Sequence, residues 1–315
     1  MKRRRTLLVL PLLGVVLAAA SCVLAPDRSA AAPRPAPPGP TAPPVTAPVR
    51  PAPLAPAATA PPPSAGLPPS ASAPSPERAA RAALDALGPH PGRYALAVED
   101  LTSGRSVTYG AVTESFVSAS IIKVDILAAL LLHVQDRGTP LTAEERRLAS
   151  AMIRRSDNDA AQQLWIEVGR RPGLDAANGR LGFSGAHAGQ QGPWGLTRTT
   201  VLDQLNLLRR VFTEDSPLTA ESRAYLRSLM GGVLAGQDWG VSAASSPAGA
   251  FALKNGWLRR DATHRWVVHS IGRVEHGGHV LLVAVLTDGQ LAYEDGISLV
   301  ERTAATAVRA LTGDS

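Results

Sequence analysis

Ser120 and Lys123 are the first two side chains in this sequence whose types and spacing suggest chemistry. A spacing of three residues places them one helical turn apart on one face, so a hydroxyl and an amine become neighbours. Near a helix N-terminus the dipole favours an oxyanion and disfavours a charged amine, so a neutral Lys123 could take the Ser120 proton. A surface lysine on an amphipathic helix gives the same short pattern. The Ile, Val and Leu residues around Lys123 favour the chemical interpretation.

Lysine is rare in this chain, and its positions are therefore informative. Lys and Arg total 32, but only Lys2, Lys123 and Lys254 are lysine. An amine can lose its proton when it is partly buried, whereas a guanidinium cannot. A chain that otherwise uses arginine thus indicates that an amine is needed at Lys123 and Lys254.

A second polar motif, Ser156-Asp157-Asn158, lies between two predicted helices, Ala143–Arg154 and 159–168. In a loop at this place, Ser156 and Asn158 can both point into a cleft. Ser, Asp and Asn are also the residues that commonly cap the following helix. The motif alone leaves both interpretations open.

A third motif, Lys254-Asn255-Gly256-Trp257, follows a predicted strand at 250–253. A glycine at a strand end lets a ligand approach the backbone, and Lys254 could pair with a substrate carboxylate. A lysine in an ordinary turn at the end of a strand is the alternative.

The elements that must position these motifs follow from periodicity and turn signals. Strands are predicted at 94–98, 106–109, 250–253, 266–274 and 280–287, the last two joined by a turn at His276-Gly277-Gly278. Helices are predicted at 76–87, from Ser120 to a stop at Gly138, at Ala143–Arg154 with a Thr142/Glu145 capping box, at 159–168 and at 199–212. A final helix has an apolar face formed by Ile297, Val300, Ala304, Val308 and Leu311.

This order of elements predicts an α/β fold. An antiparallel sheet is flanked by the terminal helices, and an all-helical subdomain is inserted between its strands.

The three motifs, in this order, resemble those of the active-site serine penicillin-recognising hydrolases, and especially class A β-lactamases, which carry S-x-x-K, S-D-N and K-T-G. Phe116, four residues before Ser120, and the stretch MIRRSDNDAA at 152–161 agree with this resemblance. The similarity extends over about residues 80–315. It implies a β-lactamase/transpeptidase-like fold, which has an α/β domain with an inserted helical domain.

The resemblance also implies a role for each motif residue. Ser120 would be the acylated nucleophile, Lys123 its activating partner, and Ser156 the relay of a proton to the leaving nitrogen. Asn158 would bind the substrate amide, and Lys254 would supply positive potential for the substrate carboxylate. Substrate would also contact the segment Asn255-Gly256-Trp257. The backbone N–H groups of Ser120 and Trp257 would form the oxyanion hole.

Three departures from the class A pattern affect these expectations. Asn255 replaces the threonine of K-T-G, an amide in place of a hydroxyl that is still able to donate a hydrogen bond. Ser156 follows Ser120 by only 36 positions (156 − 120), fewer than class A enzymes usually have, which predicts a more open cleft. Class A enzymes also carry a glutamate that activates the deacylating water, in a loop that corresponds to 181–200, where this chain has no Asp or Glu.

No other residue in that loop is a clear replacement for the missing glutamate. His187, Gln190 and Gln191 could orient a water molecule, although ordinary polar loop residues are the favoured interpretation. Acylation is therefore expected to be intact, while fast hydrolysis of the acyl-enzyme does not follow from the sequence.

The function predicted from these motifs is that of a serine hydrolase acylated at Ser120 by β-lactams or related cyclic or D-alanyl amides, with β-lactamase-type hydrolysis. A D-alanyl-D-alanine carboxypeptidase-like penicillin-binding enzyme is the first alternative. A non-catalytic envelope binding protein of the same fold is the second. The expected partner is a small-molecule β-lactam or a peptidoglycan stem peptide, and we expect a monomer that needs no cofactor.

The first 75 residues predict export and a tether. Residues 1–22 have the basic start and the short apolar run of a signal peptide, and Cys22, the only cysteine, stands where a bacterial lipobox would be lipidated. Cleavage near Ala20 without lipidation is the alternative. Residues 23–75 form a Pro/Ala-rich tether, because 18 of the 27 prolines lie between Pro33 and Pro76. The folded hydrolase domain is then 76–315, placed in the cell envelope or secreted.

Charge and the remaining polar residues exclude other function classes. The net charge of +6 comes from residues 1–75 (7 − 1), so the body is neutral and a nucleic-acid-binding domain is not supported. His276 and His279 have metal-like spacing but lack an acidic ligand pattern, so we predict no metal site. His269 could line the cleft. The sequence has no G-x-S-x-G nucleophile elbow.

Three tryptophans could contact substrate or pack in the core. Packing is the expected role for at least two of Trp239, Trp257 and Trp266.

Overall fold

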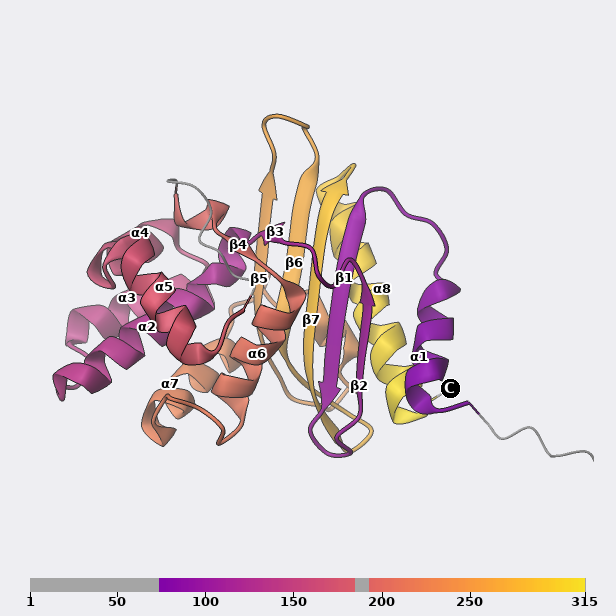
Figure 1. Ribbon diagram of the computed structural model, residues 1–315, viewed down its shortest axis with the longest axis horizontal. Coiled ribbons are helices and arrows are strands. Elements are labelled where there is room, and N and C mark those ends of the chain that lie inside the picture. Colours follow the sequence, from indigo (N-terminus) through magenta and orange to yellow (C-terminus); the bar gives the residue numbers. More distant parts are fainter. Residues whose placement is uncertain (1–73, 185–192, 315) are drawn as a thin grey trace, which may run out of the picture. The chain divides into compact units, whose positions relative to one another are not determined.

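A five-stranded sheet organises the residues that this computed structural model describes, 74–184 and 193–314 (Figure 1). The strands lie in the order β2-β1-β7-β6-β5, with bounds Ser106–Gly110, Arg93–Asp100, His279–Gln290, Trp266–His276 and Phe251–Arg259. Every neighbouring pair is antiparallel. Within the described residues, β5 is therefore an edge strand with one open side.

Both faces of the sheet are covered by helices. Strand β7 shows this in its sequence, because residues 281–287 are all buried and almost all apolar instead of alternating with polar residues. On one face lie α1, Pro76–Asp85, and α8, Tyr293–Thr312, which also contact each other (Figure 1). The predicted apolar face of α8 is confirmed: Val300, Ala304, Val308 and Leu311 are fully buried, and Ile297 is partly buried.

The other face carries the helical unit that precedes β5 in the chain (Figure 1). Its helices are α2 Ile122–Arg137, α3 Ala143–Arg154, α4 Asn158–Glu167, α5 Arg170–Leu181, α6 Val201–Phe212 and α7 Ala220–Gly231. Helix α2 is the centre of this unit and is buried on all sides over most of its length. Helix α6 contacts β1, β6 and β7, and so joins the helical unit to the sheet. The predicted antiparallel sheet with flanking helices and an inserted helical subdomain is confirmed.

Several predicted boundaries are confirmed in detail. Gly138 ends α2 in the left-handed conformation at φ 65°. Thr142 and Glu145 form the capping box of α3. The turn between β6 and β7 lies at Gly277-Gly278, with positive φ at both glycines. In the described residues, no helix is both long and apolar enough to cross a membrane.

Other boundaries were predicted incompletely or not at all. Helices α5 and α7 were not predicted. Helix α5 contains Pro172, Gly173 and Gly179, residues that usually indicate a break. Strand β5 was predicted to end at residue 253 but continues to Arg259, because its pairing with β6 overrides the weak strand preference of Asn255 and Gly256.

Candidate active site

Ser120 lies in a tight turn between a short strand and α2. Strand β3, Phe116–Val117, pairs with β4, Arg198–Thr199, and the 3-10 turn η1, Ala119–Ile121, leads directly into α2. Ala119 has a φ of 47°, an uncommon conformation for a residue other than glycine. Ser120 is partly exposed. The predicted place at a helix start is therefore refined, since Ser120 belongs to the turn that precedes the helix.

Lys123 is buried in the first turn of α2 and faces the second motif. Its Nζ lies 2.6 Å from Ser156 O, 3.1 Å from Ser156 Oγ and 2.8 Å from Asn158 Oδ1. The carbonyl and the amide oxygen can only accept, so they take two N–H bonds of the amine. A neutral Lys123 would then have its lone pair directed to the hydroxyl hydrogen of Ser156. The S-x-x-K lysine is thus not a surface residue.

Lys254 approaches the same hydroxyl from the sheet. Its Nζ donates to Ser156 Oγ at 3.0 Å and to Asn255 O at 2.8 Å, and the residue is almost fully buried. Ser156 Oγ therefore joins the two lysines of the folded domain, one from α2 and one from β5. The three motifs, far apart in the sequence, meet at this atom.

The sequence left two roles open for the second motif, capping of the following helix and a place in the cleft. Asp157 takes the capping role, and Asn158 is placed for the other. Asp157 is the N-cap of α4, with its Oδ1 accepting from Ala160 N at 2.8 Å. Asn158 is exposed, and its Oδ1 accepts from Lys123 Nζ. No hydrogen bond from its NH2 group to residues 74–184 or 193–314 is present, so this donor is free for a substrate group.

Burial of the two amines determines their charge. Burial lowers the pKa of Lys123 from 10.5 to about 7, and the negative charge of Asp157 partly opposes this change. Burial also holds the pKa of Lys254 well below its usual value, and the nearby charge of Lys123 lowers it further. Two positive charges on one hydroxyl are unfavourable, so near neutral pH the pair favours a neutral amine.

Trp257 presents its backbone N–H to the open edge of β5. At one end of the β5–β6 pairing, Ala250 O accepts from Glu275 N at 2.9 Å. At the other end, Arg260 N donates to Arg265 O at 2.8 Å. Hydrogen bonds between antiparallel strands alternate, so the even-numbered residues of β5 bond to β6 and the odd-numbered ones direct N–H and C=O outward. The N–H of Trp257 is therefore available at this edge.

Gly256 brings this edge against the turn that contains Ser120. A Cβ added at Gly256 would lie 2.8 Å from Ser120 N and 2.7 Å from Ile121 N. Only glycine allows β5 and η1 to pack this closely. The N–H groups of Ser120 and Trp257 thus belong to neighbouring segments, as a two-donor oxyanion hole requires. The glycine makes room for the turn as well as for the ligand that the sequence suggested.

The side chain of Asn255 is committed within the protein. It is buried, and its NH2 group donates to Gln237 O at 3.0 Å and to Trp239 O at 2.9 Å. Direct donation from Asn255 to substrate, expected from its place in the motif, would require breaking one of these bonds. In this arrangement Asn255 fixes the loop behind β5.

Trp194 stands beside Lys123 at the end of the loop that contains no acidic residue. Its ring centroid is 4.8 Å from Lys123 Nζ. The short turn η2, Trp194–Leu196, is held by Thr197, whose carbonyl accepts from Ser118 N at 2.8 Å. The contact between Trp194 and Lys123 could not be predicted from the sequence, because a single tryptophan in a loop is compatible with many roles. His187, Gln190 and Gln191 lie outside the described residues.

His269 does not line the cleft, which corrects the expectation for this residue. It is fully buried in β6. Its bonds go to the backbone of two other strands, with Nε2 2.7 Å from Val117 O and Nδ1 3.0 Å from Thr287 N. This role could not be predicted because a lone histidine in a strand has no local signature.

The three tryptophans pack on the opposite side of the sheet, beside α8. Trp239, Trp257 and Trp266 each have ring centroids within 6.0 Å of Tyr293. Packing is therefore confirmed for all three, and Trp257 contributes to the open edge of β5 through its backbone.

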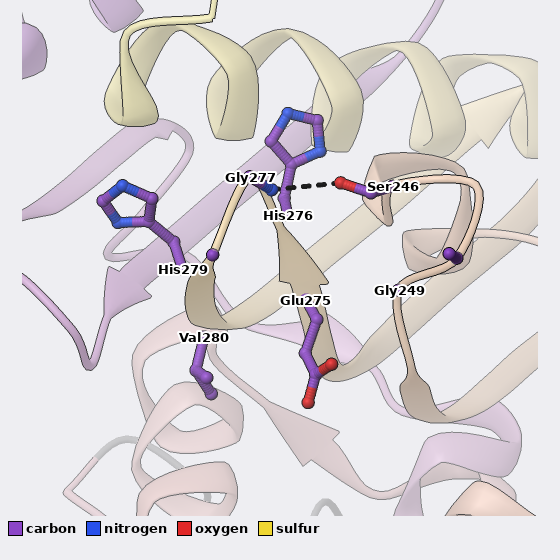
Figure 2. Close-up of a pocket in the computed structure, with 9 residues that line it drawn as sticks. Ser246, Gly249, Glu275, His276, Gly277, His279 and Val280 are labelled. Carbon is purple, nitrogen blue, oxygen red and sulfur yellow. Dashed lines mark hydrogen bonds between the residues drawn. The ribbon is translucent and has the colours of Figure 1, made fainter.

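A separate pocket of about 320 Å³ lies at the β6–β7 turn, and Figure 2 shows its lining residues. The rings of His276 and His279 point away from each other (Figure 2). His276 Nδ1 lies 2.8 Å from Ala244 O, and His279 Nδ1 lies 2.7 Å from Asp100 Oδ2. No group of three or more potential metal ligands is present among the described residues.

Solved structures of several known proteins have the same fold as this chain. A β-lactamase from Xanthomonas campestris pv. campestris is 21% identical, with a TM-score of 0.64 over 76% of this chain and 99% of its own. A class A β-lactamase from Bacteroides cellulosilyticus is 15% identical, with a TM-score of 0.66 over 77% and 100%. A point mutant of PBP-A, solved as an acyl-enzyme complex with penicillin G, is 19% identical, with a TM-score of 0.63 over 75% and 97%.

The chain therefore has the fold of the β-lactamases and penicillin-binding serine hydrolases. No protein-family model and no curated protein sequence matches it. At these identities the likeness concerns the fold, and the activity must be argued from the site.

Proposed function

We propose that this protein is a serine hydrolase that is acylated at Ser120 by β-lactams or related cyclic or D-alanyl amides. The observation that supports this proposal most strongly is the meeting of Lys123, Ser156 and Lys254 at one hydroxyl, close in the chain to a partly exposed serine. A buried amine with a pKa of about 7 is suited to take a proton at physiological pH.

In the acylation step, Ser120 Oγ attacks the amide carbonyl and its proton passes to Lys123, whose lone pair must turn from the Ser156 hydroxyl toward Ser120 for this step. The developing oxyanion is stabilised by the N–H groups of Ser120 and Trp257. In the free protein no hydrogen bond joins Ser120 Oγ to Lys123 within the described residues, and catalytic bonds of this kind commonly tighten when substrate binds. Ser156, bonded to both lysines, then passes a proton to the leaving nitrogen as the C–N bond breaks.

Substrate contacts follow from the same geometry. Lys254 would provide positive potential for a substrate carboxylate in its protonated form, which the nearby carboxylate would favour against the effect of burial. The free NH2 of Asn158 would bind the substrate amide. The open edge of β5 accepts an extended substrate through its outward N–H and C=O groups.

Deacylation is the step in which this site departs from class A enzymes. Beside Lys123 the described part of the loop, 193–200, has the indole of Trp194 and no carboxylate. An indole has no basic atom to activate water. We therefore infer a slow hydrolysis of the acyl-enzyme. This favours, as a second candidate, a D-alanyl-D-alanine carboxypeptidase-like penicillin-binding enzyme.

One experiment separates these candidates. The domain is incubated with a chromogenic cephalosporin while absorbance and intact mass are followed together, with Ser120→Ala as the control. Steady turnover that the control lacks supports a β-lactamase. A stoichiometric adduct that persists supports the penicillin-binding enzyme, and release of D-alanine from a peptide ending in D-alanyl-D-alanine should then be measured. Neither turnover nor adduct would leave only the non-catalytic binding protein.

We further propose that the enzyme is exported and acts in the cell envelope as a monomer. The basic start and short apolar run of residues 1–22, the lone cysteine at position 22 and the Pro/Ala-rich composition of 23–75 support this place of action. Labelling cells with a radioactive fatty acid tests the anchor, since Cys22→Ser should abolish incorporation and release the protein. Incorporation that survives this change would refute the anchor.

A further inference from the structure

His269 forms a cross-link between three strands. Its Nδ1 receives the backbone N–H of Thr287 in β7 at 3.0 Å, and its Nε2 lies 2.7 Å from Val117 O in β3. A backbone N–H can only donate and a carbonyl can only accept, so Nδ1 is unprotonated and Nε2 carries the hydrogen. The partners thus fix one neutral tautomer. Burial lowers the pKa of His269 to about 4, consistent with this neutral form.

His269 is connected to Ser120 in two ways, through the chain and through the sheet. Through the chain, Val117 precedes Ser120 by three residues in the same tight segment. Through the sheet, His269 is the partner of Gly256 in the β5–β6 register, and Gly256 packs against the Ser120 N–H. His269 of β6 is therefore hydrogen-bonded to one of the segments that would provide the oxyanion hole and paired with the other.

Besides His269, the segment around β3 is anchored by Arg93 of β1, whose guanidinium donates to Ser115 O at 3.0 Å and lies 4.2 Å from the Phe116 ring centroid. Strand β3 has only two residues and pairs only with β4, which is equally short. The ring of His269 also packs edge-on against Phe116, with centroids 6.2 Å apart. Within the described residues, this histidine is the side chain that ties the β3 backbone to the five-stranded sheet by a hydrogen bond.

We propose that His269 is a positioning residue that sets the distance between the Ser120 and Trp257 N–H groups. It touches neither substrate nor the reacting atoms, and acts by holding Val117 against the sheet. This inference rests on the proposed acylation of Ser120 for its effect on rate, but its effect on the turn itself is independent of that function.

Two amide substitutions, which differ in the hydrogen bond that they keep, separate positioning from simple stability. In His269→Gln the amide nitrogen can reach the place of Nε2 and donate to Val117 O. In His269→Asn the shorter side chain can accept from Thr287 N but cannot reach Val117. Each variant keeps one of the two hydrogen bonds, so each should lose thermal stability, and His269→Asn should lose more because its shorter side chain leaves a larger cavity. Rates are therefore compared at a temperature at which both variants are folded.

The acylation rates of the two variants should differ. With a fluorescent penicillin, His269→Gln should acylate within about threefold of the parent. His269→Asn should be about 10- to 100-fold slower at saturating penicillin with little change in the half-saturating concentration, because a misplaced oxyanion donor affects the transition state more than binding. Equal acylation rates in the two variants would overturn the proposal.

Hydrogen exchange supplies the readout that does not depend on activity. The peptide covering 116–122 should exchange its amides faster in His269→Asn than in His269→Gln, measured by mass spectrometry on the folded proteins. Failure of the parent to react with penicillin would refute the proposed function, while this difference in exchange would still decide the positioning role. Equal exchange in both variants would refute that role.

Discussion

The protonation of Lys123 predicts how fast Ser120 reacts at each pH. Burial lowers the pKa of Lys123 from 10.5 to about 7. This shift corresponds to about 5 kcal/mol between the two protonation states, at about 1.4 kcal/mol per unit. At pH 7 roughly half of the molecules hold a neutral amine, compared with about one in 3,000 for an ordinary lysine. Acylation at Ser120 should therefore rise tenfold per pH unit up to about pH 7 and level off above pH 8.

Asp157→Asn tests whether the rise of the acylation rate with pH, the rising limb of the pH–rate profile, reflects the titration of Lys123. The charge of Asp157 raises the pKa of Lys123, so its removal should move the limb to lower pH by about half a unit, the size expected for a solvent-screened charge a few ångströms away. Asparagine caps a helix as well as aspartate does, so α4 should be preserved. Asp159→Asn, an exposed change in the same helical turn, is the matched control and should leave the limb in place.

The assay is the second-order rate of labelling by a fluorescent penicillin between pH 5 and 9, corrected for the intrinsic hydrolysis of the probe. Lys123→Arg removes the proposed proton acceptor, because guanidinium stays charged, and should lower the rate by about 1,000-fold or more. A rate that is flat across this range, or a limb that Asp157→Asn and Asp159→Asn shift equally, would refute a neutral Lys123 as the base.

Three further predictions concern stability, packing and domain limits. Asp125 is buried in α2 with a pKa raised to about 8, so it binds a proton on folding and the free energy of unfolding should fall as pH rises from about 4 to 8. In Asp125→Asn the urea midpoint of unfolding should change little with pH across this range, and the variant should be more stable than the parent by several kcal/mol at pH 8 to 9. Midpoints of parent and variant that fall in parallel with pH would contradict this prediction. Gly256→Ala should slow acylation about 10- to 100-fold by displacing the nucleophile turn, whereas Gly179→Ala, an open position in α5, should leave it unchanged; equal effects would exclude the contact. A chain starting at residue 74 should unfold cooperatively and react with penicillin as the longer chain does, because both hydrophobic cores lie after that point; a non-cooperative transition would move the domain boundary.

The residues of the candidate site could be predicted from the sequence because their types are unusual in their settings. A lysine among aliphatic residues at position 123, in a chain that prefers arginine, is informative without any family knowledge. That Lys123 and Lys254 meet at Ser156 could not be deduced from spacing. Residues 156 and 254 are 98 positions apart, and only the resemblance of the motif order brought them together.

The features that were missed depend on tertiary contacts. Strand β5 passes through Asn255 and Gly256 because β6 pairs with it along its whole length, which overrides local preference. The positions of Trp194 and His269 are fixed by loops and strands that only the fold brings near Ser120. Their residue types, taken singly, are typical of core packing.

The central claim is that Ser120 is the nucleophile and that its acyl-enzyme is slow to hydrolyse. The most direct test is mass spectrometry of the domain after brief exposure to penicillin G and removal of the excess, followed by proteolytic mapping over time. We predict one adduct of the full penicillin mass on the peptide containing Ser120, decaying over minutes to hours. An adduct on another serine, or complete absence of both adduct and penicillin hydrolysis, would contradict the account.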